Sequence, residues 1–294
     1  MNAQTTNIEG KPLPQLDSQM NPLGVSKITG NSLLIGACSM RVGRSARMNS
    51  HAIVKIIEDN PELDWLAFPE CALSGYGVAP VLNNINAPNT QETIDGLKRV
   101  EMTQRELETG LVLGTSWVEK DGMPYNQARI YDKFGFRGAY NKQLLTTTFK
   151  GGGEANAWSK GWENTMFFLD DMKTRRAGVL ICNDFFAHPF FTPKGDPYLM
   201  WQLARDGVGL VFVISNTICR DPGDWDQINR DWTDVKLRMF ARTTGMWIVA
   251  SNACPEKGEG SNFTSPTGIV NPQGEWVARL EDNTVGVVSH LVTL

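Results

Sequence analysis

Hydrophobic residues recur along this chain with two periods, every second residue in short runs and every third or fourth residue in longer ones. The first period is typical of strands and the second of helices. The short runs predict strands at residues 33–37, 65–68, 111–117, 126–131, 136–140, 164–169, 177–181, 209–214, 247–251, 268–271, 276–280 and 285–292. The longer runs predict helices at residues 45–60, 93–108, 198–205 and 233–244.

Strands and helices are mixed along the whole chain, without an internal repeat or a low-complexity linker. This mixture favours a single α/β domain, at residues 31–294. Residues 1–30 are polar and contain three prolines, and we expect an extension there, either an arm against a partner subunit or a mobile tail. The second helix is expected to be capped at its C-terminus by Gly110. The first carries its apolar residues on one stripe, formed by Met48, Ala52, Ile53, Ile56 and Ile57.

Composition narrows the classes of function. A net charge of −4 and a pI near 5.5 argue against a nucleic-acid partner, which requires a basic face. No apolar run approaches the roughly 20 residues of a membrane helix, and the amino terminus lacks the apolar core of a secretory signal. Five scattered cysteines fit a reduced, cytoplasmic compartment better than a disulfide framework. Three histidines without a metal-binding motif give no support for a metal site.

Three chemically capable residues stand where an apolar run gives way to polar sequence. Glu70 ends the run WLAFPE, Lys142 follows a predicted strand, and Cys182 ends the run AGVLIC. A carboxylate, an ammonium and a thiol at strand ends are the components of a cysteine hydrolase, namely a base, an oxyanion stabiliser and a nucleophile.

Each of the three also has a simpler interpretation. A single cysteine is more often a buried core residue, and we assign the other four cysteines to that class. Glu70 could be a solvated loop carboxylate, although Pro69 and the apolar segment after it favour partial burial and a raised pKa. Lys142 alone would be a surface lysine, half-buried at most by its pattern. A sharp turn after Cys182 would aim the backbone N–H of Asn183 at the attacked group.

The sequence around these residues resembles the nitrilase, or carbon–nitrogen hydrolase, superfamily. Its three blocks occur in the right order as FPECALSGYG, YNKQLL and GVLICNDFF, and later blocks also fit. The resemblance implies a four-layer α-β-β-α sandwich with Glu70, Lys142 and Cys182 as a triad. A second glutamate of the family corresponds to Glu154, in GGGEA. The resemblance further implies a homodimer or higher homo-oligomer formed through helices near the nucleophile, and no cofactor or metal.

The residues after the cysteine point to the substrate class. Cys-Asn-Asp is similar to the amidase and carbamoylase branches, whereas nitrilases usually have Trp-Glu after the cysteine. Carbamoylases then carry two arginines suited to a free carboxylate, and here Phe185 and Phe186 stand in those positions. We therefore expect a small neutral amide or N-carbamoyl substrate, with Arg220 as another source of positive charge. The residues expected to bind the substrate are Asn183, Phe185, Phe186 and Asn216.

Other functions are compatible with the same residues. An acyltransferase would use the same thioester with an amine or alcohol as acceptor, and a nitrilase would attack a nitrile carbon. A catalytically silent scaffold would bind a ligand or partner through the same pocket. A plain globular protein would require three motifs to coincide by chance. A screen of amides, N-carbamoyl compounds and nitriles for ammonia release separates the main candidates.

Overall fold

The computed structural model describes residues 32–76, 90–147, 153–189, 191–192, 195–219, 224–254, 262–263 and 265–294. The extension expected at residues 1–30 lies outside the described residues, as does Arg220. The helices are α1 (Ala46–Glu58), α2 (Gln91–Leu107), α3 (Asn183–Phe186), α4 (Leu199–Arg205) and α5 (Asp224–Thr244). The strands are β1 (Ser32–Arg41), β2 (Trp65–Ala67), β3 (Gly110–Val118), β4 (Pro124–Asp132), β5 (Gly135–Asn141), β6 (Met166–Phe168), β7 (Arg176–Ile181), β8 (Leu210–Ser215), β9 (Ile218–Cys219), β10 (Trp247–Cys254), β11 (Asn262–Phe263), β12 (Gly268–Val270), β13 (Trp276–Arg279) and β14 (Gly286–Thr293).

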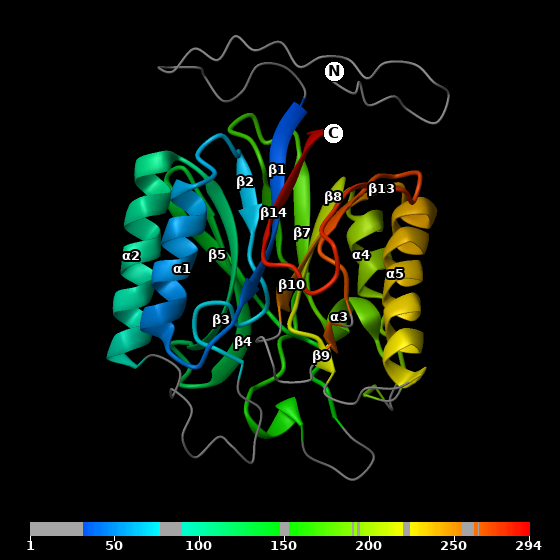
Figure 1. Cartoon of the computed structure of the whole chain (residues 1–294), viewed down its shortest axis with the longest axis horizontal. Coiled ribbons are helices and arrows are strands. Elements are labelled where there is room, and N and C mark those ends of the chain that lie inside the picture. Colours follow the sequence, from blue (N-terminus) through cyan, green and yellow to red (C-terminus); the bar gives the residue numbers. More distant parts are fainter. Residues whose placement is uncertain are drawn as a thin grey trace, which may run out of the picture.

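The strands form a ladder in the order β5-β4-β3-β2-β1-β10-β8-β7-β6, with β14 beside β1 and β12 and β13 beside β10. β1 and β10 pair only through Met40 with Ala253 and Arg41 with Cys254. Beyond this short junction the ladder divides into two sheets that face each other. α1 and α2 cover one sheet and α4 and α5 cover the other, so the fold is a four-layer α-β-β-α sandwich (Figure 1).

The sequence of β1 is apolar on both faces because the strand lies between two hydrophobic cores. Leu33, Ile35 and Ala37 belong to the core between the two sheets, which also contains β7 and β8 side chains. Cys38 and Met40 belong to a second core, formed with α1 and α2. Because successive side chains of a strand point to opposite faces, a strand in the middle of such layers needs apolar residues at nearly every position.

Three local expectations differ from the structure. Met48 is 68% exposed and Ala52 is also exposed, because α1 buries Asn49 and Ser50 beside Ile53 and Ile57. Polar Asn49 occupies the buried stripe because its amide donates to the carbonyl of Leu73. The left-handed residue that ends α2 is Glu108, while Gly110 begins β3. α5 begins at Asp224, nine residues before the apolar pattern shows it.

The direction of the strands gathers their C-terminal ends at one edge of the sandwich. β1, β2, β3, β10, β8 and β7 run parallel, and β5 shares their direction because it pairs with β3 through the antiparallel β4. The segments after β2, β5 and β7 therefore meet at this edge. Adjoining cavities of about 450 and 600 Å³ lie at the opposite edge, where Trp65, Asp132 and Asp170 line both.

Candidate active site

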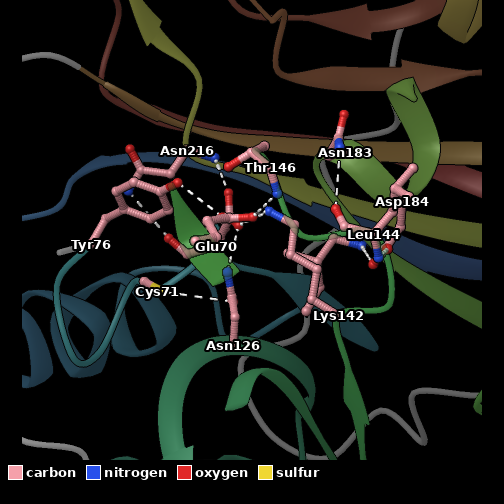
Figure 2. A network of polar contacts seen from close by, with 12 residues as sticks. Glu70, Cys71, Tyr76, Asn126, Lys142, Leu144, Thr146, Asn183, Asp184 and Asn216 are labelled. Carbon is pink, nitrogen blue, oxygen red and sulfur yellow. Dashed lines mark hydrogen bonds and ion pairs between the residues drawn. The ribbon is translucent and has the colours of Figure 1, made fainter. Parts of the chain in front are cut away.

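A buried lysine joins two buried glutamates at the edge where β2 and β5 end. The ammonium of Lys142 donates to Glu70 Oε1 at 2.7 Å (Figure 2). It also donates to Glu154 Oε1 at 2.7 Å. All three side chains are 0% exposed. Lys142 is therefore not the half-buried residue that its sequence neighbours suggest. Two carboxylates replace water around its charge, which is the condition for burying an ammonium.

Glu70 is held by a side chain of β4 and by the backbone that follows β8. The amide of Asn126 donates to Glu70 Oε1 at 2.7 Å, and the backbone N–H of Asn216 donates to Oε2 at 2.9 Å. Gly114, on β3, lies directly beneath this segment, and a Cβ there would stand 2.2 Å from the carbonyl oxygen of Pro69. Any larger residue at Gly114 would push the Glu70 segment away from its partners.

Glu154 begins a short 3-10 turn at Glu154–Asn156 and is held from both sides. The hydroxyl of Tyr76 donates to Glu154 Oε1 at 2.9 Å, and the N–H of Thr146 donates to Oε2 at 2.7 Å. The N–H of Glu154 in turn donates to the carbonyl of Thr146. These bonds fix the carboxylate against Lys142.

The backbone of Lys142 is also fixed. Its N–H donates to the carbonyl of Asn126 on β4, and its carbonyl accepts from the N–H of Gly161, both at 2.8 Å. A Cβ on Gly161 would stand 2.1 Å from the carbonyl oxygen of Asn141. The absence of a side chain at Gly161 is what allows this close approach of two backbones.

Cys182 occupies a sharp turn between β7 and α3. Its φ is +48° and its ψ −102°, a backbone conformation that non-glycine residues rarely adopt and that costs on the order of 1–3 kcal/mol. The N–H of Cys182 donates to the carbonyl of Ile214 at 2.8 Å and so links the turn to β8. The side of the residue that remains accessible is small, since Cys182 is 9% exposed. The strained turn stands at the C-terminal end of β7, and projection of the thiol from this end of the sheet stays a prediction from the sequence.

Burial and the neighbouring charges together raise the pKa of the Cys182 thiol. Burial raises the pKa of Cys182 well above 9.0, the charge of Glu70 raises it further, and Lys142 opposes both. Burial by itself lowers the pKa of Lys142, but Glu154 and Glu70 outweigh it and hold that pKa well above 10.5. Burial also raises the pKa of Glu70 above 4.5, against the pull of Lys142. Such a thiol becomes a nucleophile only when a neighbouring base removes its proton.

The model of a family described as "Carbon-nitrogen hydrolase" matches residues 49–294, which include all four of these residues. The chain belongs to the carbon-nitrogen hydrolase family. The resemblance to the nitrilase superfamily found in the sequence is thereby confirmed, and the protein is an enzyme of that class.

Solved structures share the fold of this carbon–nitrogen hydrolase at low sequence identity. An amidase from Nesterenkonia sp. is 19% identical, with a TM-score of 0.71 over 90% of this chain and 92% of that one. A glutamate-to-glutamine mutant of the amidase from Nesterenkonia sp. AN1 carries the acetamide moiety of fluoroacetamide on its active-site cysteine. It is 18% identical, with a TM-score of 0.67 over 89% of this chain and 90% of that one.

A glutamine-dependent NAD+ synthetase from Acinetobacter baumannii is also similar, at 18% identity and a TM-score of 0.68. The alignment covers 88% of this chain and 45% of the synthetase, so this chain spans less than half the length of that enzyme. No curated protein matches the sequence.

The side chains of Phe185 and Phe186, expected from the sequence to bind the substrate, lie in the core of this hydrolase. Phe185 and Phe186 are 1% and 2% exposed, and their rings pack in the core against Phe240 and Trp232. Their position gives them a packing role beneath the Cys182 turn, which differs from the substrate contact expected from the sequence. Asn216 bonds to Glu70 through its backbone N–H and, at 3.3 Å, through its side chain.

Asn183 is held by its side chain, which donates to Leu144 at 3.2 Å and to Thr192 at 2.9 Å. Its backbone N–H lies in the first turn of α3, and its role as an oxyanion donor stays a prediction from the sequence.

Four polar residues of this region were missed by sequence reasoning: Asn126, which bonds to Glu70; Tyr76, which bonds to Glu154; and Tyr140 and Asp184, which bond to each other. Asn126 begins a predicted strand, and Tyr76 lies within the Glu70 block. Their polarity within apolar surroundings is the only sequence signal for them.

The described part of the chain contains no group of three or more histidine, cysteine or acidic residues arranged to hold a metal. It also contains no helix long and apolar enough to cross a membrane.

Proposed function

We propose that this enzyme hydrolyses the C–N bond of a small amide or N-carbamoyl compound through an acyl-thioester on Cys182. The observation that carries the proposal is the ammonium of Lys142 held between Glu70 and Glu154 without solvent contact. Cys182 stands in a strained turn after β7, whose C-terminal end lies at the same edge of the sandwich as those of β2 and β5. The acetamide adduct of the Nesterenkonia amidase gives further support, because it forms on the active-site cysteine of a similar fold.

In the first half of the reaction, Glu70 takes the proton of the Cys182 thiol while sulfur attacks the carbonyl carbon. The carbonyl electron pair moves onto oxygen, where Lys142 and the N–H of Asn183 stabilise the negative charge. The intermediate then collapses and the C–N bond breaks. The leaving nitrogen takes the proton from Glu70, which leaves a thioester on Cys182 and releases ammonia or an amine.

In the second half, Glu70 takes a proton from water as the water oxygen attacks the thioester carbon. Collapse of this intermediate breaks the S–C bond, and the sulfur recovers the proton from Glu70. Glu154 acts on Lys142, whose ammonium it holds at 2.7 Å. In each half-reaction Glu70 takes up one proton and later donates it.

A panel of substrates tests the proposal. Purified enzyme is incubated with short amides, N-carbamoyl compounds and nitriles, and ammonia release is measured with wild type and Cys182→Ala. Ammonia release from amides that depends on Cys182 supports the proposal, and release from nitriles alone contradicts it. Added hydroxylamine distinguishes water from an amine acceptor, because an acyltransferase gives the hydroxamate as its main product.

We also propose that neutral amides are preferred to N-carbamoyl amino acids with a free carboxylate. Phe185 and Phe186 stand where related carbamoylases have arginines, and buried rings offer no charge to an anion. The test is kcat/KM for an N-carbamoyl amino acid against its methyl ester. A clear preference for the free acid contradicts the proposal, and loss of that preference in Arg220→Ala would assign the charge to Arg220.

A homo-oligomer is the proposed assembly, and the cytoplasm the proposed compartment. α4 and α5 present Trp201, Val235 and Met239 to solvent at 42%, 55% and 51% exposure, which supports pairing through these helices. The described cysteines Cys38, Cys71, Cys182 and Cys254 are free thiols, as in a reducing compartment. Sedimentation of wild type against Val235→Asp tests the assembly, since a monomeric wild type would contradict it.

A further inference from the structure

The carboxylate of Asp184 accepts four hydrogen bonds, although the reaction proposed above gives it no task. Asp184 Oδ1 accepts from the N–H of Gln143 at 3.0 Å and of Leu144 at 2.5 Å. Oδ2 accepts from the hydroxyl of Tyr140 at 2.8 Å and from the N–H of Ile181 at 3.3 Å. The residue is 1% exposed. Four donors aimed at one buried carboxylate fix its position and theirs.

These donors flank two catalytic residues of the proposed reaction. Tyr140 and Gln143 stand on either side of Lys142, whereas Ile181 precedes Cys182 and Asp184 follows it by two residues. β5 and β7 belong to opposite sheets of the sandwich. Figure 2 shows Asp184 beside Leu144, close to Lys142. One side chain therefore links the segment that carries the ammonium to the turn that carries the thiol.

We propose that Asp184 is a positioning residue, which sets the separation between Lys142 and Cys182 by tying β5 to β7. The inference rests on the proposed function, because it assigns to Lys142 the stabilisation of charge on the group that Cys182 attacks. The backbone N–H of Lys142 bonds to β4, in the same sheet as β5, and so does not fix Lys142 relative to the opposite sheet. Asn183 adds one bond between the two segments, from its side chain to the carbonyl of Leu144 at 3.2 Å, whereas Asp184 accepts three from Tyr140, Gln143 and Leu144.

A displacement of about 1 Å between reacting groups can cost on the order of 100-fold in rate. Asparagine at position 184 keeps the shape of the side chain but replaces one oxygen by an N–H₂ donor. That donor would face the Ile181 N–H or lie near the N–H groups of Gln143 and Leu144, where two donors repel. The two segments would then separate, while Cys182 and Glu70 remain in place.

A purely structural role makes a different prediction, and Asp170 supplies the matched control. Its buried carboxylate accepts from the N–H and the hydroxyl of Thr174 at 2.9 and 2.6 Å, and from the N–H of Arg175 at 3.4 Å. Asp170 lines the cavities at the opposite edge of the sandwich. Loss of its charge removes the acceptor of these three bonds, together with an ion pair to Arg175 at 3.7 Å, far from Lys142.

The experiment compares Asp184→Asn, Tyr140→Phe and Asp170→Asn with wild type. Tyr140→Phe removes one of the four bonds and serves if Asp184→Asn folds poorly. Each protein is assayed for kcat and KM on a short amide, per active site titrated, and for the rate of Cys182 alkylation by iodoacetamide. Alkylation requires the thiol and its base but develops no oxyanion, so it does not depend on Lys142 in that role.

We expect Asp184→Asn to lower kcat by about 100-fold, with KM within about threefold and alkylation within about fivefold of wild type. Tyr140→Phe should lower kcat by about tenfold, as for one hydrogen bond. Asp170→Asn should keep kcat within about twofold.

Three results would overturn the inference. The first is an equal loss of kcat in Asp184→Asn and Asp170→Asn, and the second is a fall in the alkylation rate of Asp184→Asn as large as its fall in kcat. The third is a wild-type kcat in Tyr140→Phe. Failure of the proposed function looks different: wild type would release no ammonia, or Cys182→Ala would match it, and the inference would fall with it.

Discussion

Lys142 and Glu70 are 72 positions apart in the sequence, yet their ammonium and carboxylate lie 2.7 Å apart with neither side chain exposed. Moving two charges out of water costs several kcal/mol each, and apolar residues of similar size often stabilise a fold as well or better. Stability alone therefore does not account for this pair. An enclosed charge pair does suit a reaction that develops charge, because electrostatic interactions are stronger away from water.

Replacement of Lys142 by alanine should reduce both stability and turnover. It leaves Glu70 and Glu154 buried without their shared cation, and we expect a loss of about 3–5 kcal/mol in the free energy of unfolding. Urea unfolding measures this loss, and kcat should fall far more than KM changes. Lys55→Ala is the control, because its ion pair with Asp59 is exposed to solvent and should contribute little to stability. Equal stability of the two variants would contradict the prediction.

Cys182→Ala should abolish turnover without disturbing the fold. The thiol is the only covalent nucleophile in the proposed scheme, and removal of one member of a cooperating set costs several orders of magnitude in kcat. Ammonia release and circular dichroism check the two halves of the prediction. Wild-type-like activity in this variant, together with an essential Cys38 or Cys71, would identify a different nucleophile.

Glu70→Gln should change how the alkylation of Cys182 depends on pH. In wild type the rate should rise as Glu70 ionises, at a pH above the usual 4.5 because burial raises the pKa of Glu70, and then level off. The variant lacks the base, so its rate should keep rising beyond pH 9, because burial also raises the pKa of Cys182. Iodoacetamide kinetics between pH 4 and 10 measure both curves. Superimposable curves would exclude Glu70 as the base.

Activity should survive exhaustive treatment with EDTA and be lost to iodoacetamide, with substrate protecting. In the proposed reaction Lys142 supplies the positive charge that a metal supplies in other hydrolases, and Cys182 is the group that iodoacetamide alkylates. Assays before and after chelation, and with each divalent metal added back, test this. Recovery of a lost activity by zinc or another metal would refute the scheme.

Stability should respond to the ionisation of Asp184. Burial raises the pKa of Asp184 from 3.8 to about 6, against the effect of Lys142. The folded state thus binds this proton more tightly than the unfolded state, so wild type gains stability as pH falls from about 6 to about 4. Relative to Asp184→Asn, the gain should be roughly 3 kcal/mol. Unfolding free energies of both proteins from pH 4 to 7 measure it, and a constant difference would contradict it.

The sequence predicted the buried strands because their apolar runs are regular, whereas the four layers were expected from the family resemblance. Val179 and Phe212 lie within uninterrupted apolar runs, and both prove to be buried in strands. The buried face of a helix was harder to predict where polar residues enter the core. Asn49 is buried in α1 because Leu73 accepts its amide hydrogen, a partner 24 positions away that no local pattern reveals.

The order of the three motifs placed Glu70, Lys142 and Cys182 at strand ends, and the structure brings the strands that carry them to one edge. The burial of Lys142 could not be predicted, because its partners come from 72 residues before and 12 residues after it. The packing of Phe185 and Phe186 in the core could not be predicted for a related reason. A position beside the nucleophile in sequence fixes the backbone but not the side to which a ring turns.

The pairing of β14 with β1 has a consequence for synthesis of the chain. Ser32 lies opposite Thr293, and the two strands remain in register over eight residue pairs. During translation β1 is made early, yet its edge beside β14 stays open until residue 293 has left the ribosome. Contacts of such long sequence separation fold slowly and expose unpaired strand edges meanwhile. Newly made chains should therefore depend on chaperones for nearly the whole of their synthesis.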